Sequence, residues 1–425
     1  MLFGKFILVL CVSSSLPSPE QLTAEQKAEL EEKLKKVGEF NSNIMLNVDY
    51  SNGESDIVKM DSEKTSRARR QAVRHPLSKW ANGVNYFFGT DAPDRLKEVF
   101  KKATQYWMRY TCINFTENSS AKDKIQVMRD RYGGCSSELG RRGGTQGLWL
   151  GDNCMSLRSA THELGHALGL IHTQSRPDRD EAVFVNTENI KGGGKNGDYA
   201  KEDKNLVETY GLPYDYGSIM HYDAYSNAID KKKPAIMPKD ELYIRTLGSP
   251  SLSYYDKILI NKHYGCMENC NATNSIQCAN YGFPNPRNCS ECICPDGYGG
   301  PKCDQRPKGC GKVIRATSSS PRKFSAFVGE LKDGQERREC HYWIQAPKGK
   351  RIEFKILTVV DWASCGGCFT GGVEIKAKAD PRLTGYRYCA PEDKRFTVVS
   401  ESNLVPVIAY NQGNVFEATI QYRVV

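Results

Sequence analysis

Three histidines and one glutamate lie within eleven residues of this chain, in the run His162-Glu163-Leu164-Gly165-His166-Ala167-Leu168-Gly169-Leu170-Ile171-His172. On a helix, residues four apart lie on the same face, so His162 and His166 can bind one metal ion. A glycine three residues after the second histidine can adopt the positive φ that ends a helix, which brings His172 back as a third ligand. Three neutral protein ligands are typical of a catalytic zinc site and leave one position for water.

The position of Glu163 beside these ligands indicates a hydrolytic reaction. Zinc lowers the pKa of bound water from ~15.7 to about 7, which makes hydroxide available at neutral pH. Glu163 would act as general base toward that water and then as general acid toward the leaving amine. We therefore predict hydrolysis of peptide bonds with one zinc ion per subunit. The alternative interpretation is a helix whose histidines bind no metal. That interpretation does not explain Gly169 or His172, and three of the chain's seven histidines would lie within these eleven residues by chance.

The long form of the motif resembles the metzincin signature, and the sequence around it resembles the astacin branch. The matching segments are Gly140-Arg141-Arg142-Gly143-Gly144-Thr145-Gln146, Ser175-Arg176-Pro177-Asp178-Arg179-Asp180 and Ser218-Ile219-Met220-His221-Tyr222. The last resembles the family's Met-turn. The resemblance implies that Met220 forms an apolar floor under the zinc. It also implies that Tyr222 reaches the metal, swings away when substrate binds and then hydrogen-bonds the oxyanion.

Two residues depart from the astacin pattern. Leu170 stands where the family usually has Phe, and Thr173 stands where a Glu normally follows the third histidine. In the family, that Glu bonds the buried amino terminus of the mature enzyme. We therefore expect the mature terminus of this chain to be satisfied in another way or left unanchored, and we assign no anchoring role to Thr173.

The elements that must position these residues can also be predicted. Residues 84–88, bounded by Gly83 and Gly89, are typical of a strand, and apolar residues at helical spacing predict a helix over residues 95–111. A strand-rich half followed by the zinc helix suits the α+β metzincin plan over residues 71–266. We expect substrate to lie extended along an edge strand in the cleft, which implies an endopeptidase.

The first seventy residues indicate export and activation by cleavage. At 425 residues the chain exceeds the size of a single core, so several domains are expected. Residues 1–16 are typical of a secretory signal peptide, and no other stretch approaches the ~20 apolar residues of a transmembrane helix. Residues 17–70 are polar and charged, as in a propeptide. They end in Arg67-Ala68-Arg69-Arg70, which predicts cleavage between Arg70 and Gln71 by a furin-like convertase.

The predicted propeptide contains a candidate inhibitory ligand. Astacin propeptides carry an Asp that occupies the water position on zinc, and Gly53-Glu54-Ser55-Asp56-Ile57 is the nearest resemblance here. Asp56 is the candidate, Asp49 is the alternative, and a solvated propeptide Asp is the third interpretation. A carboxylate on the fourth zinc position would displace the nucleophilic water until the propeptide is removed.

The cysteines indicate disulfides in an oxidising compartment. Of sixteen, Cys11 would leave with the signal peptide, so fifteen remain. The resemblance implies Cys112–Cys266 and Cys135–Cys154 in the peptidase domain. Residues 267–306 resemble an EGF-like module, without a calcium pattern, whose pairing by analogy is Cys270–Cys289, Cys278–Cys292 and Cys294–Cys303.

Residues 310–425 resemble a CUB domain, an all-β sandwich with turn-bounded strands of alternating apolar residues. Cys310 should pair with Cys340, and Cys389 with either Cys365 or Cys368. One cysteine is then left without an evident partner, as a free thiol or an intermolecular link. The acidic cluster that gives many CUB domains a calcium site is not recognisable here, because Gly372 and Asn411 stand near where carboxylates would be needed.

The remaining sequence features concern partners and location. Four sequons, at Asn114, Asn118, Asn271 and Asn288, fit an exported glycoprotein. The formal charge of +9 comes from Lys and Arg scattered among Asp and Glu, so nucleic acid is not expected as a partner, and affinity for an anionic matrix is a less favoured alternative.

Together these features predict a multidomain, secreted, zinc-dependent endopeptidase made as a zymogen. Its EGF-like and CUB modules would position it on a protein substrate or on an extracellular or cuticle matrix, and the domain order resembles nematode astacins. The alternative is a catalytically inactive extracellular binding or matrix protein on the same scaffold. Intact Glu163, Tyr222 and all three histidines argue against that alternative.

Overall fold

The computed structural model describes residues 57–58, 72, 78–194, 198–270, 275–331, 337–360, 366–413 and 415–425. Residues 50–425 belong to one compact unit. Some predicted features lie outside the described residues, namely the signal peptide, most of the propeptide, Asp49, Asp56, Arg70, Gln71, Asn271 and Cys365. No helix in the described part of the chain is long and apolar enough to cross a membrane.

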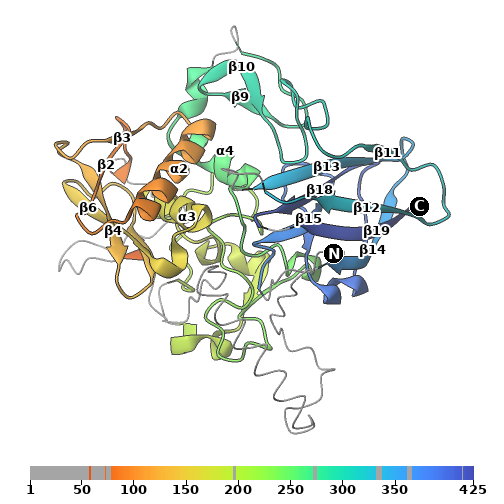
Figure 1. Cartoon of the computed structure of the whole chain (residues 1–425), viewed down its shortest axis with the longest axis horizontal. Helices are drawn as coiled ribbons and strands as arrows, with labels where there is room; N and C mark the ends of the chain where they lie inside the picture. The colour runs from red at the N-terminus through yellow and green to blue at the C-terminus, as the bar shows by residue number, and fades with distance from the viewer. Residues whose placement is uncertain are drawn as a thin grey trace, which may run out of the picture. The chain divides into compact units, whose positions relative to one another are not determined.

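A six-stranded sheet forms the first part of this unit (Figure 1). Its strand order is β1-β5-β6-β4-β2-β3, in which β5 runs antiparallel to β6 and the other neighbours pair in parallel. The strands are β1 (Ile57–Val58), β2 (Val84–Phe88), β3 (Phe115–Glu117), β4 (Lys124–Asp130), β5 (Cys135–Glu138) and β6 (Thr145–Gly151). The predicted strand over residues 84–88 is confirmed as β2. β1 comes from the predicted propeptide and covers the edge at β5.

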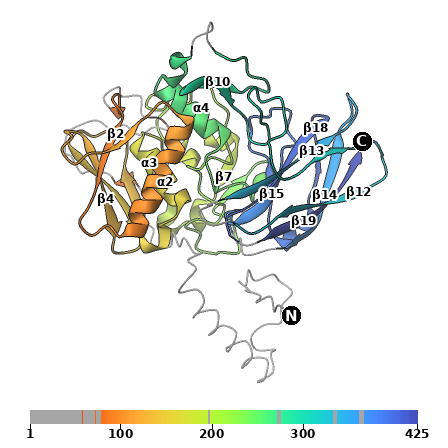
Figure 2. The same cartoon turned by 45° about the horizontal axis from the view of Figure 1, so that its top comes forward.

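Two helices lie side by side next to this sheet, as both views show (Figures 1 and 2). Helix α2 (Asp94–Tyr110) confirms the predicted helix to within one residue and buries its apolar face. Helix α3 (Leu157–Ala167) carries the first two histidines of the motif and begins at Ser156, whose side chain accepts a hydrogen bond from the Ser159 amide. The Trp107 indole donates a 3.0 Å hydrogen bond to the Thr161 carbonyl, which ties α3 to α2.

Loops, short strands and one further helix follow the zinc motif. The two-stranded ribbon β7 (Val183–Val185) and β8 (Ile236–Pro238) precedes α4 (Tyr254–His263). Short 3-10 helices lie in connections along the described chain. η3 (Asp152–Cys154) precedes the motif and η10 (Pro391–Arg395) lies in the β-sandwich; those between are η4 (Thr173–Ser175), η5 (Arg179–Glu181), η6 (Thr187–Asn189), η7 (Lys191–Gly194), η8 (Glu241–Tyr243) and η9 (Cys266–Asn269). Helix α4 begins with a capping box between Ser253 and Asp256.

We predict that His263, the last residue of α4, makes the free energy of unfolding depend on pH. Burial lowers its pKa to about 3, and the Tyr210 hydroxyl lies 3.1 Å from Nδ1. The unfolded chain would bind this proton near pH 6.5, so the free energy of unfolding is expected to fall as pH drops from about 6.5 toward 3, by a few kcal/mol. Above about pH 6.5 this group contributes no pH dependence.

Denaturant titrations at several pH values, on the wild type and on His263→Gln, measure this effect. Gln cannot titrate, so the difference in stability between the two proteins should shrink as the pH falls. Identical pH dependence in both proteins would show that His263 is not responsible.

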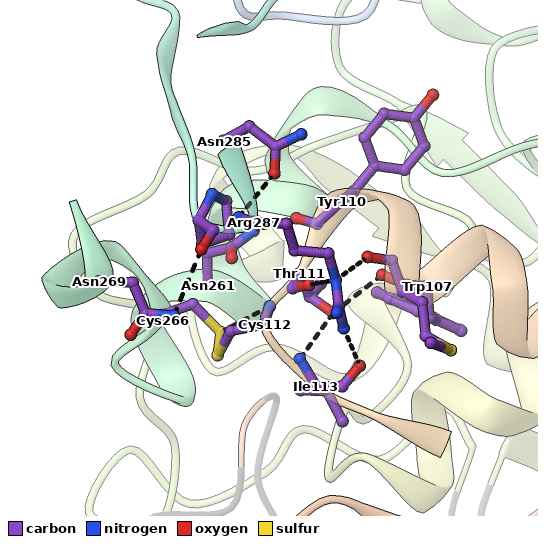
Figure 3. The surroundings of a disulfide bond; sticks show 12 residues. Trp107, Tyr110, Thr111, Cys112, Ile113, Asn261, Cys266, Asn269, Asn285 and Arg287 are labelled. Atoms are coloured by element: carbon purple, nitrogen blue, oxygen red, sulfur yellow. Dashed lines mark hydrogen bonds between the residues drawn. A yellow bond between two sulfur atoms is a disulfide. The ribbon is translucent and has the colours of Figure 1, made fainter. Parts of the chain in front are cut away.

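A disulfide-rich hairpin follows α4, and the side chain of Arg287 in its turn is hydrogen-bonded to the chain at the end of α2 (Figure 3). Its strands are β9 (Phe283–Asn285) and β10 (Asn288–Ile293), and Arg287 lies in the turn. The Arg287 guanidinium donates hydrogen bonds of 2.7 and 2.6 Å to the Thr111 and Ile113 carbonyls, beside the Cys112–Cys266 disulfide. The bond to Thr111, the C-cap of α2, satisfies a carbonyl that a helix end leaves without an intrahelical partner, and the bond to Ile113 holds the chain just beyond the helix.

Two sheets, antiparallel except at β11, form a β-sandwich over residues 313–424, with one core between them (Figure 2). The first sheet has the order β11-β13-β18-β15-β16 and the second β12-β19-β14-β17. The strands are β11 (Val313–Arg315), β12 (Arg322–Val328), β13 (Arg338–Gln345), β14 (Ile352–Val360), β15 (Gly371–Ile375), β16 (Tyr386–Tyr388), β17 (Thr397–Val399), β18 (Leu404–Asn411) and β19 (Phe416–Val424). β11 pairs in parallel with β13.

The disulfides in the described part of the chain coincide with the pairs that the resemblance implies. They are Cys112–Cys266, Cys135–Cys154, Cys270–Cys289, Cys278–Cys292, Cys294–Cys303, Cys310–Cys340 and Cys368–Cys389. Cys389 therefore pairs with Cys368. The predicted sequons at Asn114, Asn118 and Asn288 are exposed.

Candidate metal centre

The three histidines of the motif converge on one point. Helix α3 ends at Ala167, and Gly169 has the predicted positive φ, 98°, which turns the chain so that His172 returns. The Nε2 atom of His166 lies 3.1 Å from that of His162 and 3.2 Å from that of His172. Nitrogens around a tetrahedral zinc at about 2.0–2.1 Å are about 3.3 Å apart. The donor set therefore fits one zinc ion.

Hydrogen bonds at the other ring nitrogens fix two of these imidazoles in the metal-binding tautomer. Nδ1 of His162 donates to the Ile219 carbonyl and Nδ1 of His166 to the Leu170 carbonyl, each over 2.7 Å. A carbonyl oxygen can only accept, so each Nδ1 carries the hydrogen and each Nε2 presents its lone pair. All three rings are buried. The site is thus preorganised for a cation.

A buried carboxylate, Asp198, lies beside the third ligand. Its Oδ1 is 3.9 Å from Nδ1 of His172, and both side chains are at most 2% exposed. Its backbone carbonyl accepts a 2.7 Å hydrogen bond from the Ser175 hydroxyl, which anchors the segment. The sequence does not predict a role for Asp198, because it follows a glycine-rich stretch with no metal-binding pattern. Its placement depends on contacts made only in the folded chain.

Met220 lies under the zinc helix, where the resemblance implies it. A Cβ atom added to Gly165 would come within 2.6 Å of the Met220 sulfur, so glycine at this helix position makes room for the Met220 side chain. The Thr173 amide donates a 2.9 Å hydrogen bond to the Met220 carbonyl. The Met220 turn is thus hydrogen-bonded directly to the residue that follows His172.

A second carboxylate that the sequence did not predict, Asp256, holds this turn from helix α4. It accepts a 2.6 Å hydrogen bond from the Ser218 hydroxyl and a 2.8 Å bond from the Ile219 amide. Burial raises the pKa of Asp256, and these bonds counteract that rise. The capping-box spacing of Ser253 and Asp256 is a sequence signal for a helix start. It does not indicate which distant turn the carboxylate contacts.

Tyr222 and Glu163 both lie at the histidine cluster. The ring centroid of Tyr222 is 4.5 Å from that of His172, and the side chain is buried. Glu163 is 2% exposed and follows His162 on α3. The site therefore brings together every peptidase-domain residue of the predicted active site.

His221 fixes the backbone next to Tyr222. Its Nδ1 donates to the Tyr222 carbonyl and its Nε2 accepts from the Tyr214 hydroxyl, each over 2.6 Å. Burial lowers the pKa of His221 to about 4. The ring is therefore neutral at pH 7, as this pair of bonds requires.

Near the predicted mature terminus, Ala72 is fully buried and pairs antiparallel with Leu170. Thr173 is also fully buried, and its hydroxyl has no hydrogen-bond partner among the described residues. Gln71 lies outside those residues, so the expected absence of a terminus-to-Thr173 contact stays a prediction.

Comparisons with known proteins agree with this geometry. A sequence profile of the astacin peptidase family matches residues 72–265. Zinc metalloproteinase nas-31 of Caenorhabditis elegans is 42% identical over 370 residues, which are 85% of this chain and 59% of that protein. Zinc metalloproteinase nas-25 of the same organism is 35% identical over 372 residues, 84% of this chain and 91% of that protein.

Among solved structures, high choriolytic enzyme 1, a hatching enzyme zinc-protease from Oryzias latipes, is 32% identical with a TM-score of 0.40 and covers 44% of this chain and 92% of its own. The chain spans about three fifths of nas-31 and nine tenths of nas-25. The profile match and the identity to nas-25 show that this chain belongs to the astacin family of zinc metalloendopeptidases, with His162, His166 and His172 as its zinc-binding triad.

Proposed function

We propose that this chain is the zymogen of a secreted endopeptidase that cuts extracellular proteins. The convergence of three imidazole nitrogens beside buried Glu163 is the observation that carries the proposal. A zinc ion bound there would act as a Lewis acid toward the scissile carbonyl and would acidify a water molecule.

Glu163 is proposed as the proton carrier. It is buried next to His162, where a water-excluding environment strengthens interactions with a developing charge. Its carboxylate takes a proton from the attacking water and passes it to the leaving amine. Tyr222 is proposed to donate a hydrogen bond to the oxyanion from its place beside His172, while Met220 supports the triad from below.

The substrate is proposed to pair with strand β5. Once β1 has left, β5 is an edge of the sheet and presents unpaired backbone groups to an extended peptide. An open edge accepts the middle of a long chain as readily as its end. This arrangement supports endopeptidase activity.

Latency is proposed to depend on the same edge. Residues 57–58 pair with Ser137 and Glu138 of β5, so the propeptide occupies the place where substrate would pair. Asp56, next to this strand, remains the candidate zinc ligand of the zymogen. Cleavage between Arg70 and Gln71 by a furin-like convertase would release the segment.

The remaining modules are proposed to serve recognition outside the cell. Residues 1–16 would direct export, residues 17–70 would form the propeptide and residues 71–266 the peptidase domain. The three-disulfide hairpin supports an EGF-like module over residues 267–306, and the two-sheet sandwich supports a CUB domain over residues 310–425 with an extracellular matrix partner. Many disulfides support an oxidising, extracellular location.

The experiment that tests this proposal compares the secreted chain before and after treatment with a furin-type convertase, using an unstructured protein as substrate. We expect internal cleavage only after treatment, and its loss when a zinc chelator is added. Cleavage by the untreated chain would contradict latency. A correctly processed, zinc-loaded chain that cuts nothing would favour the inactive binding protein.

A further inference from the structure

The β-sandwich contacts the peptidase residues that lead into the zinc site. The Thr384 hydroxyl donates a 3.2 Å hydrogen bond to Oδ1 of Asp215, which also accepts a 3.1 Å bond from the Gly217 amide. A Cβ atom added to Gly217 would lie 2.4 Å from both Cγ2 and Oγ1 of Thr384. The backbone at Gly217, which does not have a positive φ, therefore requires glycine for this close approach.

This contact continues without a gap to the first zinc ligand. Gly217 precedes Ser218, whose hydroxyl is held by Asp256 of α4. The next residue, Ile219, accepts the hydrogen bond from Nδ1 of His162 through its carbonyl. The segment between Asp215 and Ile219 is thus fixed by α4 at Ser218 and Ile219 and by the β-sandwich at Asp215 and Gly217.

A second contact reaches the zinc helix itself. The guanidinium of Arg158, in the first turn of α3, lies 4.4 Å from the ring centroid of Phe369 in the β-sandwich. Arg158 also donates a 2.8 Å hydrogen bond to the Ser249 carbonyl. Cation–π contacts of this kind strengthen when water is excluded. The β-sandwich therefore touches both elements that position His162.

The contact between the two parts is buried and includes apolar and polar groups. Tyr216 stacks on Tyr243 with centroids 4.2 Å apart, and Tyr243 in turn packs on Tyr386 of β16 and lies within the core of the β-sandwich. Arg387, 3% exposed, divides its hydrogen bonds between Glu374 of its own sheet and the Ser249 hydroxyl. If the β-sandwich separated from the peptidase residues, the buried Arg387 guanidinium would lose its hydrogen bond to Ser249. Flexibly tethered modules do not share a core in this way.

We propose that the β-sandwich is a structural part of the active site, which holds the 215–219 segment and α3 in the geometry that zinc binding requires. It thus acts on the site through positioning residues, Thr384 and Phe369, in addition to any role in recognition. The proposal rests on the proposed peptidase function only where the test measures kcat. Zinc affinity tests it independently.

A compensation experiment in the full-length, processed chain tests the first contact. Gly217→Ala should weaken zinc affinity, measured by chelator competition, by about 10-fold, the lower end of what loss of outer-shell support costs. It should also lower kcat on a short peptide too small to reach a remote recognition surface. Combining it with Thr384→Gly removes the opposing side chain, so both properties should recover in part.

Matched controls are Gly413→Ala, where an added Cβ meets nothing within 4 Å, and Thr397→Gly at an exposed position of β17. Both should keep wild-type zinc affinity. Phe369→Ala changes only the β-sandwich and covers the case in which Gly217→Ala does not fold, and it should also weaken zinc affinity.

Wild-type zinc affinity in both Gly217→Ala and Phe369→Ala would overturn the proposal. Failure of Thr384→Gly to restore any zinc affinity to Gly217→Ala would also overturn it. If zinc affinity follows the expected pattern but the wild type cuts no peptide, the proposed peptidase function fails and the positioning role stands.

Discussion

Glu163→Gln is expected to lower kcat on a peptide substrate by about 10²–10⁴-fold while the zinc affinity stays close to that of the wild type. Gln has nearly the same shape as Glu but can neither accept nor return the proton. Because Glu163 lies on α3 between the two helical ligands without being one of them, the triad should remain intact. Steady-state kinetics of the convertase-processed chain and zinc content measured on the same sample check both parts.

The matched control is Glu188→Gln, which makes the same change at an exposed position in η6. It should leave kcat and KM unchanged. Equal activity in Glu163→Gln and the wild type would exclude Glu163 as the proton carrier. Loss of zinc from Glu163→Gln would instead assign it a role in metal binding.

Asp198→Asn is expected to weaken zinc binding by about 10- to 100-fold, as removal of outer-shell partners commonly does. The substitution keeps the size of the side chain and removes the negative charge that lies 3.9 Å from Nδ1 of His172. That charge favours the hydrogen on Nδ1 and increases the basicity of the nitrogen that faces the metal. Zinc dissociation constants from chelator competition give the main measurement.

A cobalt-substituted sample adds a spectroscopic readout, because a change at the third ligand should shift the visible absorption bands of the bound metal. A purely structural role for Asp198 would destabilise the fold without shifting those bands. Asp203→Asn, at an exposed position nearby in the sequence, is the control and should match the wild type in both measurements. Unchanged zinc affinity in Asp198→Asn would rule out the proposed orientation of His172.

The part of the site that sequence predicts is the part whose geometry is local. His162 and His166 are one helical turn apart, and Gly169 can reverse the chain only because it tolerates positive φ, so their spacing is enough to predict the cluster. The first strand and the helix before it follow in the same way from local apolar periodicity. These elements matched the structure to within a residue.

The parts that sequence does not predict depend on contacts between distant segments. Asp198 and Asp256 are ordinary acidic residues in the printed sequence, and only folding places one beside His172 and the other on Ser218. Thr384 lies in the β-sandwich, far along the chain from the glycine that it packs against. The pairing of Cys389 with Cys368 also depends on the fold, because spacing in the sequence allows either Cys365 or Cys368 as its partner.

Strand β1 bears on how the proposed latency would end. In the described part of the chain it pairs with β5 in parallel through residues 57 and 58, and parallel pairing is the slightly weaker form of strand association. We expect this parallel pairing to depend on the covalent link between the propeptide and the peptidase, which keeps the effective concentration of the strand high. Cutting that link removes this advantage at once, so the released segment should diffuse away and the same peptide added in solution should inhibit poorly. Activation would then need one cut and no further degradation of the propeptide.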